Sequence, residues 1–192
     1  MIIGITGNSG SGKTKIAKIL AEKINAKIID ADKIAKKMTS SKTKYLEKIT
    51  EKFGENILEN GTLKRQALAK IIYNNKEKKE ELDKLTYKYV VEEILREIDK
   101  TKTENIIIDA PLLFESGLDK ACEITIAIIA KNDIKTKRIC DRDKISVETA
   151  KARLAMQSTE NYYKEKADYM LENNGRIEDV DLEEICIKIG KN

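Results

Sequence analysis

Apolar residues in this chain fall into two patterns, short continuous runs and longer stretches with helical spacing. The continuous runs, at Ile2–Thr6, Lys27–Asp30, Ile106–Asp109 and Ile124–Ala130, are rich in isoleucine and predict buried strands. Between the first two runs, Ile and Leu side chains recur three or four positions apart over residues 16–24, which predicts an amphipathic helix. Strands that are apolar throughout and separated by helices are typical of a parallel sheet covered on both faces. The pattern therefore predicts an α/β fold.

Residues 33–103 have a different character, because they are highly charged and their apolar residues have mostly helical spacing. An Asn60-Gly61 pair marks a turn among them. The apolar residues that predict two of their helices are Tyr45, Ile49 and Phe53, and then Leu82, Leu85 and Tyr89. We expect a helical lobe at 33–103, inserted into a single domain of residues 1–192 whose core is built from residues 1–32 and 104–192.

The chain beyond the fourth apolar run returns to helical spacing. Residues 133–165 are predicted to be helical and basic, and Ser146 stands where it can cap one of these helices. Residues 169–172 predict a last short strand, and residues 178–189 a closing helix. Strands and helices therefore alternate to the end of the chain.

The strongest chemical signal is a glycine-rich loop between the first strand and the first helix. Glycines allow backbone angles that other residues avoid, so that successive N–H groups can surround an anion at the helix N-terminus. In the pattern G-x-x-x-x-G-K-[ST], the lysine reaches the β- and γ-phosphates and the following hydroxyl can bind Mg²⁺. The loop predicts a nucleoside triphosphate site of the P-loop NTPase type and consists of Gly7, Asn8, Ser9, Gly10, Ser11, Gly12, Lys13 and Thr14.

Carboxylates follow two of the predicted strands, at the sheet edge where parallel α/β proteins bind ligands. Asp30 and Asp32 follow the second strand, and in an extended chain they would face the same side. One of them could orient or deprotonate a substrate hydroxyl, while Asp32 could also cap a helix over residues 33–37. Asp109 ends the third strand and could hold Mg²⁺ or serve as a turn residue before Pro111. The residues alone leave these roles open.

Basic residues gather on one predicted helix face just beyond the fourth strand. Lys135, Arg138 and Arg142 lie at helical spacing, and Arg153 follows in the next helix. A helical hairpin over residues 134–160 could close over a triphosphate as a lid, bringing positive charge to the transferring phosphoryl group and excluding water. A basic face turned to solvent would show the same spacing, so both interpretations stand.

Composition narrows the chemistry further. The chain has no His, which excludes His-dependent nucleophiles, metal ligands and acid–base groups. Phosphoryl transfer needs positioning, Mg²⁺ and positive charge instead, so the interpretation of the loop is unaffected. The net charge of +4, from 37 Lys and Arg against 33 Asp and Glu, suits a small anionic substrate and is too small to argue for nucleic acid.

The segments that direct proteins to membranes are missing from the sequence. No run approaches the length of a membrane span, and the chain begins with a strand instead of the features of a signal peptide. The three cysteines are far apart and form no metal or redox motif, which suits a reducing compartment. We expect a cytoplasmic protein with no membrane partner and no nucleic-acid partner, whose oligomeric state the sequence does not determine.

Further motifs follow the glycine-rich loop in a set order. They are Ile29–Ala35, Phe53-Gly54, Asn60–Leu68, Asp109–Glu115, Arg142-Asp143, Arg153 with Gln157, Ala167-Asp168 and Asn173–Gly175. The loop alone is generic, but the ordered set resembles the dephospho-CoA kinase family over nearly the whole chain. Asp109–Glu115 is the most telling stretch of this resemblance.

The resemblance implies a nucleotide-binding core, a helical lobe for the CoA side and a lid. It also implies an enzyme that uses ATP and Mg²⁺ to phosphorylate the ribose 3′-hydroxyl of dephospho-CoA. By similarity, Asp32 would be the catalytic base and Lys13 would contact the transferring phosphoryl group. Arg142 and Arg138 would supply the lid cations, and Asn174 falls where the family packs the adenine. Thr14 and Asp109 remain the expected metal ligands.

The sequence departs from the family in the helical lobe. The family usually carries a His-Pro pair where this chain has Leu85-Thr86-Tyr87-Lys88. This departure bears on one substrate-side contact and not on the phosphate chemistry.

Three other functions fit part of the sequence. Another small-molecule P-loop kinase, acting on a nucleoside or nucleoside monophosphate, would share the loop and the lid arginines but not the segments at Asp30–Asp32 and Asp109–Glu115. A nucleotide-dependent switch of the GTPase kind would need an Asn-Lys-x-Asp motif, which Lys131-Asn132-Asp133 does not supply. A kinase that has lost its activity and binds nucleotide only is the third alternative.

Overall fold

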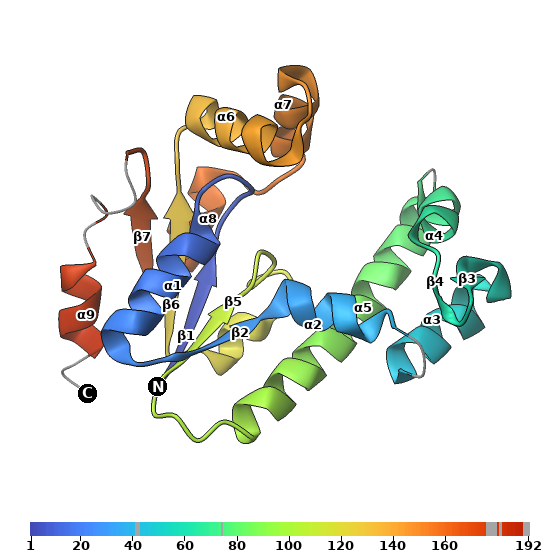
Figure 1. The fold of residues 1–192 in the computed structure, drawn as a ribbon, viewed down its shortest axis with the longest axis horizontal. Coiled ribbons are helices and arrows are strands. Elements are labelled where there is room, and N and C mark those ends of the chain that lie inside the picture. Colours follow the sequence, from blue (N-terminus) through green and yellow to red (C-terminus); the bar gives the residue numbers. More distant parts are fainter. Residues whose placement is uncertain (41–42, 74, 176–179, 181, 190–192) are drawn as a thin grey trace. The chain divides into compact units, whose positions relative to one another are not determined.

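The chain folds into two compact units, one made from its two ends and one from its middle (Figure 1). The first unit comprises Met1–Asp30 and Thr101–Asn192, and the second comprises Ala31–Lys100. The computed structural model describes residues 1–40, 43–73, 75–175, 180 and 182–189. In those residues, no helix combines the length and low charge that a bilayer crossing requires.

A five-stranded sheet in the order β2-β5-β1-β6-β7 forms the centre of the first unit. Every pair of neighbouring strands is parallel, which confirms the predicted sheet. The strand formed by the fourth apolar run ends at Ile129, one residue before the predicted end at Ala130. The strands are β1 (Ile2–Thr6), β2 (Lys27–Asp30), β5 (Ile106–Asp109), β6 (Ile124–Ile129) and β7 (Tyr169–Glu172).

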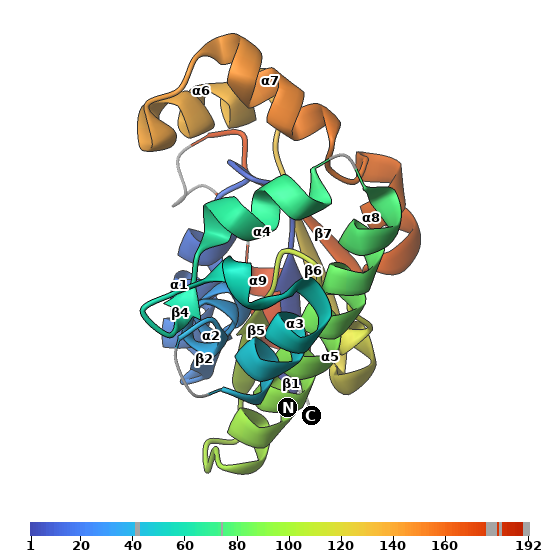
Figure 2. The same cartoon turned by 90° about the vertical axis from the view of Figure 1, so that its right-hand side faces the viewer.

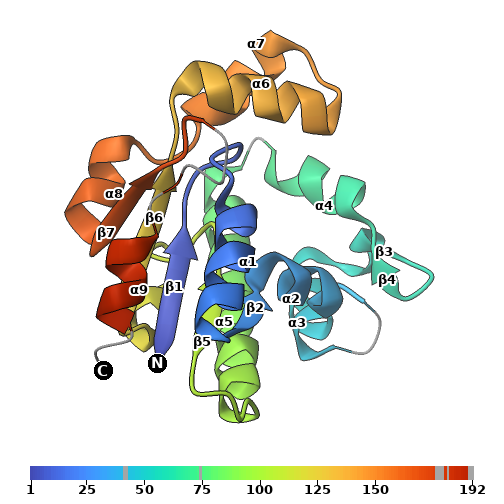
Figure 3. The same ribbon diagram turned by 60° about the vertical axis from the view of Figure 1, so that its left-hand side comes forward.

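Helices cover the sheet because each strand is apolar on both faces. In Figure 3, α1 (Lys13–Ile24) and α9 (Glu183–Ile189) lie against the same face of the sheet. The side chains that form the core there are Ile3, Ile5, Ile16, Leu20, Ile107, Ile126, Ile128, Leu182 and Ile185. The observed α9 overlaps the closing helix expected at 178–189, of which residues 178, 179 and 181 lie outside the described part of the chain.

The basic stretch after β6 folds into three separate helices. Ser146 accepts a hydrogen bond at its Oγ from the backbone N–H of Thr149 at 3.2 Å, so it caps the second helix as predicted. Lys144 has a φ of 55° and turns the chain between the first two helices, which form a hairpin in Figure 2. The helices are α6 (Asn132–Asp143), α7 (Val147–Ala155) and α8 (Glu160–Lys166).

The second unit is mostly helical, with a core centred on Tyr45, Ile49 and Ile57. A short antiparallel hairpin, which the sequence predicts only as a turn, brings Leu58 opposite Leu63. Asn60 and Gly61 have φ values of 51° and 73°, which the tight turn between these strands requires. The elements are α2 (Ala31–Met38), α3 (Lys44–Phe53), η1 (Glu55–Ile57), β3 (Leu58–Glu59), β4 (Thr62–Leu63), α4 (Arg65–Ile72) and α5 (Lys76–Asp99).

We predict that Ile126→Ala lowers the free energy of unfolding by about 2–5 kcal/mol, because it leaves a cavity between the sheet and its helices. Ile126 is fully buried, whereas Ile187 on α9 is 54% exposed. The same change at Ile187 should alter stability by less than about 1 kcal/mol. Urea unfolding of the two variants measures the difference, and equal losses would contradict this account of the core.

Candidate active site

The glycine-rich loop leaves β1 and leads directly into α1. Gly7, Gly10 and Gly12 have φ values of 143°, 79° and 91°, in the region that favours glycine. A Cβ on Gly7 would lie 2.3 Å from the carbonyl oxygen of Ile128. A Cβ on Gly12 would lie 2.1 Å from Nδ2 of Asn173. Because Gly12 is the N-cap residue of α1, the loop ends at the positive end of a helix, as an anion-binding loop does.

Lys13 and Thr14, in the first turn of α1, both contact Asp109 at the end of β5. Nζ of Lys13 forms an ion pair with Oδ1 of Asp109, and Oγ1 of Thr14 donates a hydrogen bond to Oδ2 at 2.8 Å. The carboxylate is 3% exposed and the lysine side chain 11%. A carboxylate beside a hydroxyl supplies the oxygen ligands that Mg²⁺ prefers, and Mg²⁺ completes its shell with water and phosphate. These residues fit a magnesium ion that arrives with a nucleotide.

The carboxylates after β2 do not take the arrangement that the sequence predicts. Asp30 pairs in register with Asp109 on the neighbouring strand, so both stand at the carboxyl edge of the sheet. The helix α2 begins at Ala31, so the chain is not extended through Asp32, and the extended segment on which the expected common direction depended is wrong. Asp32 lies exposed in the first turn of α2. It therefore interacts with the helix dipole from within the helix and is not a cap for residues 33–37.

Arg138 of α6 supports the loop from its carbonyl side. Its Nη1 lies 3.3 Å from the carbonyl oxygen of Gly10, 3.4 Å from that of Ser11 and 3.0 Å from that of Asn173. Its Nη2 donates to Oδ1 of Asn173 and to the carbonyl oxygen of Gly175, both at 3.3 Å. Buried carbonyl groups need donors, and Arg138 supplies them behind the loop. The side of the loop opposite Arg138 is then available for backbone N–H groups to face an anion.

Asn173 is a supporting residue that the sequence analysis missed. Asn173 is 2% exposed. Its Nδ2 donates to the carbonyl oxygen of Ser11 at 2.7 Å, and its backbone N–H donates to the carbonyl oxygen of Ile129 at 2.9 Å. The neighbouring Asn174 is less buried, and its Oδ1 accepts from the N–H of Lys131 at 2.8 Å. The only sequence signal is the Asn-Asn-Gly turn, which does not show which of the two amides turns inward.

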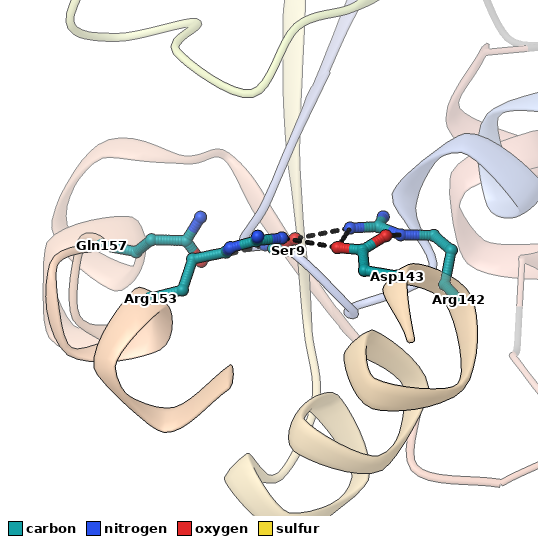
Figure 4. Close-up of polar contacts among 5 residues, drawn as sticks. All are labelled: Ser9, Arg142, Asp143, Arg153 and Gln157. Atoms are coloured by element: carbon teal, nitrogen blue, oxygen red, sulfur yellow. Dashed lines mark hydrogen bonds and ion pairs between the residues drawn. The ribbon is translucent and has the colours of Figure 1, made fainter. Parts of the chain in front are cut away.

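Ser9 joins the loop to α6 and to the segment after α7 (Figure 4). Its Oγ accepts a hydrogen bond from Nη2 of Arg142 at 3.2 Å, and its N–H donates to Oε1 of Gln157 at 3.0 Å. Asp143 lies between the guanidinium groups of Arg142 and Arg153 and accepts from both. The expected lid hairpin therefore contacts the loop, with Arg142 and Arg153 in one polar cluster.

Lys135 does not share the exposed face that its spacing with Arg138 and Arg142 predicts. Its side chain is only 9% exposed, and burial lowers the pKa of its ammonium group. The backbone at Lys135 approaches the loop closely, because a Cβ on Gly10 would lie 2.7 Å from the Lys135 carbonyl oxygen. Of Lys135, Arg138 and Arg142, the two arginines contact the loop through their side chains.

Asn8 joins the loop to α8 on the other side. Its Oδ1 accepts from the hydroxyl of Tyr163 at 2.7 Å, and its Nδ2 donates to the carbonyl oxygen of Ser158 at 2.9 Å. Ser158 in turn donates from its Oγ to Glu115, in the segment after β5, at 3.0 Å. Burial raises the pKa of Tyr163 to about 12, so its hydroxyl stays protonated as a donor at neutral pH.

A parallel sheet, a glycine loop at a helix N-terminus and an adjacent lysine, hydroxyl and carboxylate define a P-loop phosphotransferase. The model of the dephospho-CoA kinase family matches residues 1–179. The chain therefore belongs to the dephospho-CoA kinase family, and its class is that of the transferases.

Individual relatives agree with this assignment. A dephospho-CoA kinase of Fusobacterium nucleatum is 41% identical over 182 residues, which cover 94% of this chain and 93% of the relative. The solved dephospho-CoA kinase of Campylobacter jejuni is 31% identical, with a TM-score of 0.65 over 99% of this chain and 95% of its own. A solved Thermus thermophilus protein, 28% identical, has a TM-score of 0.81 over 100% of this chain and 96% of its own.

We predict that Asn173→Ala lowers the free energy of unfolding by about 1–3 kcal/mol, because it removes the 2.7 Å hydrogen bond to the Ser11 carbonyl and one acceptor of Arg138 at a buried site. Asn174→Ala is the matched control, and its effect should be smaller because water reaches the groups that it leaves unpaired. Urea unfolding of both variants gives the comparison. A larger loss for Asn174→Ala would show that the second amide supports the loop.

Proposed function

We propose that this chain transfers the γ-phosphoryl group of ATP to the ribose 3′-hydroxyl of dephospho-CoA, giving coenzyme A and ADP. The observation that carries the proposal is the intact phosphate loop, with Lys13 and Thr14 on Asp109, in a chain that the family model matches over residues 1–179. The substrates are then ATP and dephospho-CoA. We also propose that the enzyme works in the cytoplasm, with neither nucleic acid nor membrane as partner.

The loop would bind the triphosphate through its N–H groups, whose opposite carbonyls already have donors in Arg138 and Asn173. Lys13 would exchange its partner Asp109 for phosphate oxygens. Arg142 would meet the transferring phosphoryl group, since its side chain is 59% exposed beside Ser9 of the loop. Charge that develops in the transition state is then met by groups that are already in place.

Mg²⁺ would be held by Thr14 and Asp109, which present a hydroxyl and a buried carboxylate side by side. Bound there with ATP, it supplies positive charge to the phosphate oxygens. Asn174 would pack beside the adenine, on the segment whose Gly175 carbonyl Arg138 also holds. The same arginine would thus support both ends of the nucleotide site.

Asp32 would accept the proton of the ribose 3′-hydroxyl or orient it toward the phosphoryl group. Asp32 lies in the first turn of α2, where the N–H groups at the helix N-terminus carry partial positive charge.

The departure from the family at Thr86 lies on α5, in the second unit. There the Thr86 hydroxyl donates to the carbonyl oxygen of Leu82 at 2.7 Å and lies 2.9 Å from the hydroxyl of Tyr45.

A coupled assay of ADP formation tests the activity directly. We predict that the protein forms ADP with dephospho-CoA and not with a panel of nucleosides and nucleoside monophosphates. Lys13→Ala should abolish turnover, because it removes the cation that follows the γ-phosphate. Transfer to a nucleoside monophosphate but not to dephospho-CoA would refute the proposed acceptor, and full activity of Lys13→Ala would refute the assignment of the loop.

We predict that Asp32→Asn lowers kcat by about 10²-fold or more while ATP still binds, because the amide cannot accept the hydroxyl proton. Asp99→Asn makes the same change at an exposed aspartate at the end of α5 and should leave kcat within about twofold. Steady-state kinetics and ATP binding by calorimetry measure both effects. A loss in Asp32→Asn no greater than that in Asp99→Asn would leave Asp32 with only its role in the helix.

A further inference from the structure

Asp143 in the lid joins two arginines from two different helices (Figure 4). Its Oδ1 accepts from Nε of Arg142 at 2.7 Å, and its Oδ2 accepts from Nη2 of the same arginine at 3.0 Å. Oδ2 also accepts from Nη1 of Arg153 at 2.5 Å. One carboxylate therefore fixes the plane of the Arg142 guanidinium through two bonds and links α6 to α7 through the third.

The position of Asp143 is unfavourable unless the arginines offset it. Asp143 is the last residue of α6, where the helix dipole disfavours a carboxylate. The next residue, Lys144, has a φ of 55° and starts the turn toward α7. The hydrogen bond from Arg142, with a second from Arg153, lowers the pKa of Asp143 to about 2, so the group is ionised at neutral pH. The two guanidinium groups thus counter the dipole.

The same contact prepares Arg142 for an anion. Two guanidinium groups side by side repel each other, and one carboxylate between them reduces this repulsion while leaving a net positive charge. Arg142 uses Nε and Nη2 on Asp143 and Nη2 again on Ser9 of the loop. Within the described part of the chain, no partner contacts its Nη1. The guanidinium is therefore fixed along one edge and open along another.

We propose that Asp143 is a positioning residue, which orients Arg142 toward the transferring phosphoryl group and is itself anchored to α7 by Arg153. The proposal rests on the proposed kinase function. An ordinary exposed ion pair contributes little, because its side chains are free to separate. Asp143 differs because its partners come from two helices, and one partner, Arg142, also contacts Ser9 of the phosphate loop. Loss of the Asp143 carboxylate would therefore release the Arg142 guanidinium.

The variants Asp143→Asn and Asp143→Glu test this role, with Asp141→Asn as the matched control. Asp141 is an exposed aspartate on the same helix. We expect Asp143→Asn to lower kcat about tenfold with dephospho-CoA, to change the KM for ATP by less than about threefold and to leave the thermal midpoint near that of Asp141→Asn. Asp143→Glu, which keeps the charge and both acceptor oxygens, should recover part of kcat.

A double-mutant cycle separates positioning from structure. If Asp143 acts through Arg142, Asp143→Asn should cause no further loss of kcat in an Arg142→Ala background. A second, multiplicative loss in that background would overturn the proposal. So would an unchanged kcat in Asp143→Asn, or a loss that accompanies a large fall in thermal midpoint and is not recovered by Asp143→Glu.

The same assays distinguish this proposal from the proposed function. Turnover of dephospho-CoA by the wild-type protein with no effect of Asp143→Asn would reject the positioning role and keep the kinase. Absence of turnover in the wild-type protein would reject both, since Arg142 would then have no phosphoryl group to meet.

Discussion

The phosphate loop must present backbone N–H groups to an anion, and this need constrains the rest of this structure. The N–H groups of Ser9 and Ser11 already donate to Gln157 and to the Asn8 carbonyl, so the anion is left to the other N–H groups of the loop. A loop that points its N–H groups to one side points its carbonyls to the other, and buried carbonyls require donors. Arg138 and Asn173 supply those donors to Gly10 and Ser11. The positive φ values of the glycines bend the backbone, and these two side chains hold it in that form.

The order of the strands places the partners of the loop around it. Because β1 lies between β5 and β6, the loop after β1 has Asp109 at the end of β5 on one side. On the other side β6 leads to α6, which carries Arg138 and Arg142, and β7 leads to Asn173. Residues that are far apart in the sequence therefore meet at one edge of the sheet, as the parallel topology requires.

Much of the fold could be predicted from the sequence, because the isoleucine-rich strands and the glycine loop depend on local chemistry. The loop, the strand that ends in Asp109 and the Ser146 cap are of this kind. Asn173 and the inward turn of Lys135 could not be predicted, because burial depends on which segments pack together. The start of α2 at Ala31 also escaped prediction, since neither spacing nor a capping residue fixes where a helix begins after a strand.

The identity and position of the phosphorylated product test the central claim most directly. The protein would be incubated with Mg²⁺, dephospho-CoA and ATP that carries oxygen-18 in its γ-phosphoryl group, and the product examined by phosphorus NMR. We predict that the phosphoryl group carrying the label appears as a monoester on the ribose 3′-oxygen of coenzyme A. Label found only as inorganic phosphate, or on another acceptor atom, would contradict it.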